Sequence, residues 1–117
     1  MDDTKTNNIK HIGKPWGYED ILETNEKYTV KRLLMKQGHQ CSYQYHERKM
    51  ETVLALSGRL IILLDDGEIF LEPGEVITIK PGQKHRMIAR EADALYLECS
   101  TSELDDVVRI SDDYGRK

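Results

Sequence analysis

Apolar residues occur along the chain in short runs separated by turn residues, and no window of ten or more residues keeps a helical period. Short apolar or alternating runs bounded by Gly, Pro or Asp are typical of strands. The pattern predicts strands at residues 27–36, 41–46, 51–56, 60–64, 68–71, 76–80, 85–89 and 94–100. Many short strands at this spacing predict an all-β sandwich or barrel.

The two ends of the chain depart from this pattern. Residues 1–10 are polar and are predicted to be a flexible arm, which leaves residues 11–117 as one domain. Near the other end, Ser102 to Val108 favours a helical turn, with Ser102 as its cap. We therefore expect a β domain with a short C-terminal tail or helical turn.

Composition excludes several classes of protein. The 117 residues (13.6 kDa) suit a single domain, and the net charge of −4 without a basic stripe disfavours nucleic-acid binding. The longest aliphatic run, Leu60 to Leu64, is too short to cross a membrane, and the acidic N-terminus does not resemble a signal peptide. The two cysteines, Cys41 and Cys99, form no disulfide framework, so we expect a cytoplasmic protein with free thiols.

Four residues could together bind a metal ion. Gln44 and His46 are two positions apart, so on a strand both point to the same face. A hairpin through the charged residues 47–49 would return Glu51 beside His46, and His85 follows a Pro-Gly turn. Imidazole, carboxylate and amide ligands suit a divalent ion such as Zn, Mn, Co or Fe(II). The alternative is a solvated charged face with two unrelated histidines.

The order of glycines, prolines and metal-ligand candidates resembles the two motifs of the cupin superfamily. The motif residues are Gly38, Gln44, His46, Glu51, Gly58, Gly74, Pro81, Gly82 and His85. Gln44 occupies the position at which the first motif usually has its first histidine. This substitution resembles one subgroup, the cupin domain of type II mannose-6-phosphate isomerases. Three further segments resemble the same subgroup. They are residues 14–17 (Lys-Pro-Trp-Gly), residues 28–36, and the tail, residues 105–116, which ends in Asp-Tyr-Gly-Arg.

This resemblance implies a double-stranded β-helix, or jelly-roll, barrel that holds one divalent ion (Zn, Mn, Co, Fe or Ni). Its ligands would be Gln44, His46, Glu51 and His85. The implied activity is isomerisation of mannose 6-phosphate to fructose 6-phosphate, in which the ion acts as a Lewis acid. For the catalytic residues, the resemblance points to the tail arginines Arg109 and Arg116, and Lys49 is a third candidate. An arginine fork suits a phosphate group, and Lys49 retains the charge of an arginine that is common at its position in the family.

Two other functions stay open at this point. One is a metal-binding cupin with different chemistry, such as oxidation by O₂ or modification of another sugar, and the other is a non-catalytic sugar or metabolite binder. The sequence identifies no catalytic base. Trp16 is predicted either to pack at one end of the barrel or to contact a sugar.

The expected partners are few. They are a small phosphosugar or another small anion, and a second copy of the chain in a homodimer, with no nucleic acid and no membrane. Residues 14–22 and the barrel edges are the segments expected to pair between copies. No glycine-rich nucleotide-binding loop occurs, so these 117 residues should not make a GDP-sugar alone.

Overall fold

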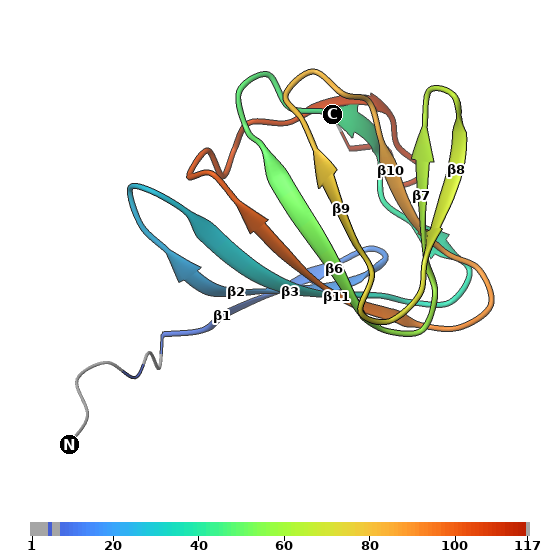
Figure 1. Cartoon of the computed structure of the whole chain (residues 1–117), viewed down its shortest axis with the longest axis horizontal. Helices are drawn as coiled ribbons and strands as arrows, with labels where there is room; N and C mark the ends of the chain where they lie inside the picture. Colours follow the sequence, from blue (N-terminus) through green and yellow to red (C-terminus); the bar gives the residue numbers. More distant parts are fainter. Residues whose placement is uncertain (1–4, 6–7, 117) are drawn as a thin grey trace.

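The computed structural model describes residue 5 and residues 8–116, which form strands and no helix (Figure 1). The strands are β1 (Lys10–Lys14), β2 (Gly17–Thr24), β3 (Thr29–Met35), β4 (His39–Gln40), β5 (Tyr43–Tyr45), β6 (Glu51–Ser57), β7 (Leu60–Leu64), β8 (Gly67–Leu71), β9 (Val76–Ile79), β10 (Arg86–Ala89), β11 (Ala94–Ser100) and β12 (Val108–Ser111). The predicted all-β class is confirmed. None of these residues belongs to a helix that is long and apolar enough to cross a membrane.

The strands form three antiparallel sheets. The largest has the order β1-β2-β3-β11-β6-β9, the second β4-β10-β7-β8, and the smallest pairs β12 with β5. A single bridge between Gln44 and His85 connects the smallest sheet to the second. In Figure 1 the six-stranded sheet lies on the left, and β10, β7 and β8 stand on the right. The two larger sheets form the walls of a barrel.

The core lies between these walls and follows from the alternation of side chains along each strand. In β3 every second residue from Thr29 to Met35 is buried. In β11, Tyr96 is fully buried on the inward face, while Leu95 and Leu97 on the opposite face are partly exposed. The largest apolar side chains that are completely buried are Tyr96, Met35, Leu60, Ile62, Ile79 and Val53. They all belong to one hydrophobic core cluster.

Every predicted run contains a strand, although 41–46 keeps only Tyr43–Tyr45. β1, β2, β4 and β12 were not predicted. β2 escapes the alternation rule because its register shifts between Ile21 and Glu23, which interrupts the period of two. The arm expected at residues 1–10 lies mostly outside the described residues and stays a prediction, with β1 beginning at Lys10.

The helical turn expected at Ser102 to Val108 is wrong. This segment is a bend and a turn that lead into β12, and no residue in it is helical. The reason is a set of long-range bonds: the Asp106 carboxylate accepts hydrogen bonds from the backbone amides of Glu47, Arg48 and Lys49. A helix cap gives one or two bonds of this kind, and three bonds to a distant loop outweigh it.

Candidate metal centre

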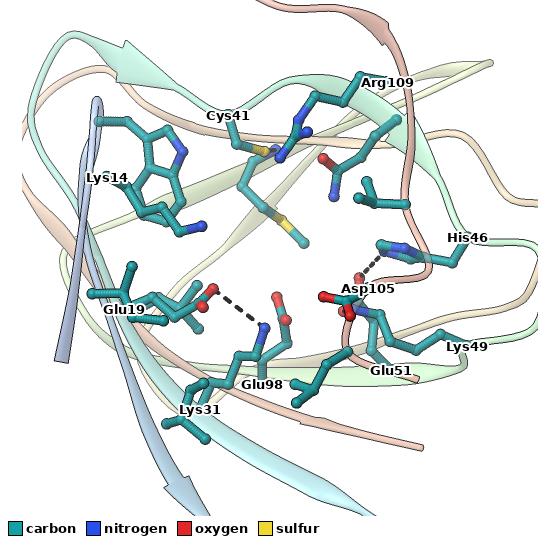
Figure 2. Close-up of a pocket in the computed structure, with 18 of the residues that line it drawn as sticks. Lys14, Glu19, Lys31, Cys41, His46, Lys49, Glu51, Glu98, Asp105 and Arg109 are labelled. Atoms are coloured by element: carbon teal, nitrogen blue, oxygen red, sulfur yellow. Dashed lines mark hydrogen bonds and ion pairs between the residues drawn. The ribbon is translucent and has the colours of Figure 1, made fainter. Parts of the chain in front are cut away.

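A cavity of about 430 Å³ opens into the barrel (Figure 2). Its walls come from strands at both ends of the sequence, from β1 and β2 to the segment before β12. All seven side chains proposed from sequence line it: Gln44, His46, Lys49, Glu51, His85, Arg109 and Arg116. The fold thus brings together residues spread over most of the chain.

Three of these side chains converge on one point. The Nε2 atoms of His46 and His85 lie 3.3 Å and 3.2 Å from Oε1 of Glu51. One ligand atom of each residue lies within 4.8 Å of the others, and all three side chains are almost completely buried. This is the spacing that three ligands of a single ion require.

The outer nitrogen of each imidazole is fixed by a backbone carbonyl. His46 Nδ1 donates to the carbonyl oxygen of Asp106 at 2.5 Å, and His85 Nδ1 donates to that of Gln83 at 2.9 Å. A carbonyl only accepts, so each Nδ1 carries a hydrogen. In a neutral ring, Nε2 then presents its lone pair to the cluster. Such a bond to the outer nitrogen is what orients a metal-binding histidine.

The donor set fits a divalent cation. His46 Nε2 and Glu51 Oε2 are buried, and neither has a hydrogen-bond partner among the described residues. Burial opposes the charge of Glu51, but without an ion the imidazoles can also carry a hydrogen on Nε2 and donate it to the carboxylate. These hydrogen bonds and the Lys49 ammonium outweigh burial and hold the pKa of Glu51 well below its usual range. Two imidazoles and an ionised carboxylate suit Zn, Mn, Co, Fe(II) or Ni. This cluster could therefore hold one metal ion.

Gln44 lines the same cavity, and its backbone is joined to that of His85 by two hydrogen bonds of 2.9–3.0 Å. Its Oε1 accepts the hydroxyl of Ser42 at 2.5 Å. A carbonyl oxygen has a second lone pair, which is the one that would face an ion. That Gln44 is a fourth ligand stays a prediction.

The sequence analysis predicted a hairpin to bring Glu51 beside His46, and this part is wrong. β5 pairs with β12, while β6, which begins at Glu51, pairs with β11 and β9. The loop between β5 and β6 instead crosses from one sheet to another across the cavity. The two side chains meet because His46, directly after β5, lies beside Glu51, the first residue of β6 in the six-stranded sheet.

The three cations proposed as catalytic occupy different positions. Lys49 Nζ lies 3.8 Å from Oε2 of Glu51, at the candidate metal centre. Arg109 on β12 lies opposite Gln44 of β5 and lines the cavity. Arg116 forms two side-chain hydrogen bonds with Asp112, and its guanidinium lies 5.7 Å from the centre of the Tyr114 ring.

Glu98 is a cavity residue that the sequence analysis missed. It projects inward from β11, on the same face as Tyr96 (Figure 2). Burial raises the pKa of Glu98 to about 8, and the neighbouring charge of Glu51 contributes to the rise. A carboxyl group two positions from a buried Tyr, in a strand, was the available signal, because side chains two apart share a face.

The sequence analysis also missed a buried ion pair between Lys31 and Glu19. Lys31 Nζ lies 3.3 Å from Oε1 of Glu19, and both side chains are about 10% exposed. The pair projects into the cavity from β3 and β2 (Figure 2). The cavity wall is thus polar well beyond the three clustered residues.

A jelly-roll barrel of antiparallel sheets with a His-Glu-His cluster on its inner wall is a cupin. Comparison with known proteins gives the particular family: residues 1–112 match the family described as mannose-6-phosphate isomerase C-terminal, and the chain belongs to it. The chain is 32% identical over 112 residues to mannose-1-phosphate guanylyltransferase of Salmonella montevideo. It is 31% identical over 113 residues to the xanthan biosynthesis protein XanB of Xanthomonas campestris. Both alignments cover 92% of this chain but only 24% of the relative, so the chain spans about a quarter of their length.

Solved structures support the fold. The capsular polysaccharide assembling protein CapF of Staphylococcus aureus superposes with a TM-score of 0.78 at 17% identity, over 95% of this chain and 37% of that one. A cupin-superfamily sugar phosphate isomerase of Silicibacter pomeroyi gives a TM-score of 0.72 at 21% identity, over 81% and 72% of the two chains. At these identities the likeness shows the cupin-like fold alone.

Proposed function

We propose that this chain is a metal-dependent aldose–ketose isomerase of phosphosugars, with mannose 6-phosphate and fructose 6-phosphate as its pair. The observation that carries the proposal is the cluster of His46, His85 and Glu51, whose buried donor atoms converge inside a polar cavity. The family to which the chain belongs, and the guanylyltransferase names of its relatives, support mannose phosphates as the substrate class.

The reaction needs two proton movements. One proton passes from C2 of the open-chain aldose to C1, and another passes from O2 to O1, so that the enediol between them is neutral overall. A bound divalent ion would polarise the two sugar oxygens. The residues of the chain must then take up and return the proton bound to carbon.

Glu98 is the carboxyl group best placed for that proton. Of the four acids lining the cavity, Glu51 faces the histidines and Glu19 is paired with Lys31, while Asp105 is exposed. Glu98 projects from the wall between these two pairs (Figure 2). The Lys49 ammonium beside Glu51 would stabilise negative charge that develops on a sugar oxygen.

The test measures isomerisation and metal content on the same samples. The protein is stripped with a chelator, reloaded with Mn, Co or Zn, and assayed with mannose 6-phosphate. We expect conversion to follow the amount of bound metal. His46→Ala should lower both metal binding and turnover, the latter by more than about 100-fold, because the ion provides the largest electrostatic contribution.

His39→Ala is the matched control. His39 lies on β4 and forms a hydrogen bond with Tyr114, and it does not line the cavity. This variant should keep both metal and activity. Equal turnover in His46→Ala and the unaltered protein would contradict the proposal. Tight sugar binding without any conversion would instead favour a non-catalytic binder.

A further inference from the structure

The end of the cavity away from the metal centre is formed by β1 and β2. Lys14, the last residue of β1, lines the cavity and directs its ammonium into it, on the side opposite His46 and Glu51 (Figure 2). Lys10 and Ile12 share this face of β1 and also line the cavity. A positive group therefore stands across the cavity from the metal ligands.

Lys14 differs from three other cations of the cavity, Lys31, Lys49 and Arg116, in its partners. Lys31 is paired with Glu19 at 3.3 Å, Lys49 with Glu51 at 3.8 Å, and Arg116 with Asp112 at 2.8 Å. Within the described part of the chain, Lys14 has no acidic group within 4.0 Å of its Nζ. Its charge is available to a ligand, whereas Lys31 and Arg116 are held by hydrogen bonds to their carboxylates, and Lys49 lies beside Glu51.

Trp16 provides a second, independent observation. Its side chain lines the cavity, is 5% exposed, and carries a buried indole Nε1 without a hydrogen-bond partner in the described residues. The indole nitrogen only donates, and a buried donor without an acceptor is costly. The missing acceptor can come from a ligand that enters the cavity.

We propose that Lys14 and the indole N–H of Trp16 form an anion subsite that binds the phosphate group of the substrate. The phosphosugar would lie with its carbonyl end at His46, Glu51 and His85 and its phosphomonoester at β1. This assignment rests on the proposed function for the identity of the ligand. Lys10, farther along the same face of β1, adds positive potential near the opening.

In this proposal the phosphate is bound by Lys14 and not by the tail arginine Arg116. Two hydrogen bonds hold its guanidinium to Asp112, whose side chain is 3% exposed. To bind a phosphate in the same way, Arg116 would have to give up a buried carboxylate, which would then be left unpaired. Lys14 loses no partner when it binds an anion.

The experiment measures binding separately from turnover. Calorimetric titration of inorganic phosphate, mannose 6-phosphate and mannose is carried out on the metal-loaded protein and on Lys14→Gln and Trp16→Phe. We expect Lys14→Gln to weaken binding of phosphate and mannose 6-phosphate by about 10- to 100-fold, as for loss of one charged hydrogen bond. Trp16→Phe keeps an aromatic ring, and the lost donor should weaken both by about 10-fold. Mannose should bind equally well to all three.

Lys27→Gln is the control, because Lys27 is an exposed residue of the β2–β3 turn outside the cavity. It should change nothing except a small salt-dependent contribution. Thermal melts of each variant exclude a general loss of fold.

The subsite is contradicted if phosphate does not bind the unaltered protein, or if Lys14→Gln and Lys27→Gln bind it equally. It is also contradicted if Lys14→Gln loses affinity for mannose and mannose 6-phosphate by the same factor. If the chain lacks isomerase activity but Lys14→Gln still weakens the binding of phosphate, the subsite is supported and the proposed reaction is contradicted. The two ideas are thus tested apart.

Discussion

At the scale of single residues, Asp106 orients the candidate metal centre without being part of it. Its backbone carbonyl accepts from His46 Nδ1, and its carboxylate accepts from the amides of Glu47, Arg48 and Lys49. The amides of Arg48 and Glu47 hold the pKa of Asp106 at about 2, so the carboxylate stays ionised at neutral pH. One residue therefore fixes both the orientation of the His46 ring and the backbone of the loop that leads to Glu51.

Replacing Asp106 should loosen this arrangement. In Asp106→Asn the charge that favours three amide donors is lost, so we expect metal affinity to fall by about 10- to 100-fold, the usual cost of losing an orienting contact. Titration with Co or Zn measures the affinity, and hydrogen exchange reports the amides of residues 47–49. Asp66→Asn, in the β7–β8 turn, is the control. Unchanged affinity together with unchanged amide protection would contradict this role.

The candidate metal residues were accessible from the sequence for a physical reason. Gln44 and His46 are two positions apart, and the period of a strand alone places them on one face. Glu98 and Asp106 were not identified, because their roles depend on contacts made across the barrel. A strand pattern gives the face on which a residue lies, whereas it does not give the partner on the opposite wall.

At the scale of elements, the tail is bound to the barrel by polar contacts. β12 pairs with β5, and Arg86 donates from its guanidinium to the carbonyl oxygens of Cys41 and Ser111. Beyond β12, the Tyr114 hydroxyl pairs with His39 Nδ1 at 2.8 Å. Apolar periodicity could not predict this attachment, since side-chain and backbone polar groups provide most of it.

Acid should weaken the attachment of the tail. The Arg116 guanidinium holds the pKa of Asp112 at about 2, below its ordinary value of 3.8. Because the folded pKa is the lower one, the ionised carboxylate stabilises the fold above about pH 4, and this contribution is lost as the pH falls towards 2. Melting temperatures measured from pH 7 to pH 2 should show the decline. Asp112→Asn should be less stable at pH 7 and change less below pH 4, and parallel curves would argue against the pair.

The turn between β6 and β7 requires a glycine at position 58. Gly58 has a φ of 70°, and a Cβ there would lie 2.1 Å from the carbonyl oxygen of Asp93. Gly58→Ala should therefore lower the free energy of unfolding by more than about 1 kcal/mol. Gly13→Ala in β1, where nothing lies within 4 Å of the added atom, should be close to neutral. Urea unfolding compares the two, and equal stabilities would contradict the steric argument.

At the scale of the whole molecule, the homodimer stays a prediction, but the strand order changes which segments could form the interface between the two copies. Residues 14–22, expected to pair between copies, mostly belong to β2, which is already paired on both sides by β1 and β3. The strands with one open side in the largest sheet are β1 and β9. Light scattering after size-exclusion chromatography should give twice the chain mass of 13.6 kDa, and a 13.6 kDa species at micromolar concentrations would contradict the prediction.

The position of β11 has a consequence for the order of folding. This strand lies between β3 and β6, and its last residue, Ser100, pairs with both Thr29 and Glu51. A growing chain on the ribosome therefore cannot complete its largest sheet until residue 100 has emerged. Until then, the edges of β3 and β6 that pair with β11 have no partner strand. Contacts so distant in sequence slow folding. The late arrival of one strand, which also carries Glu98, makes the emergence of β11 the step at which this barrel closes.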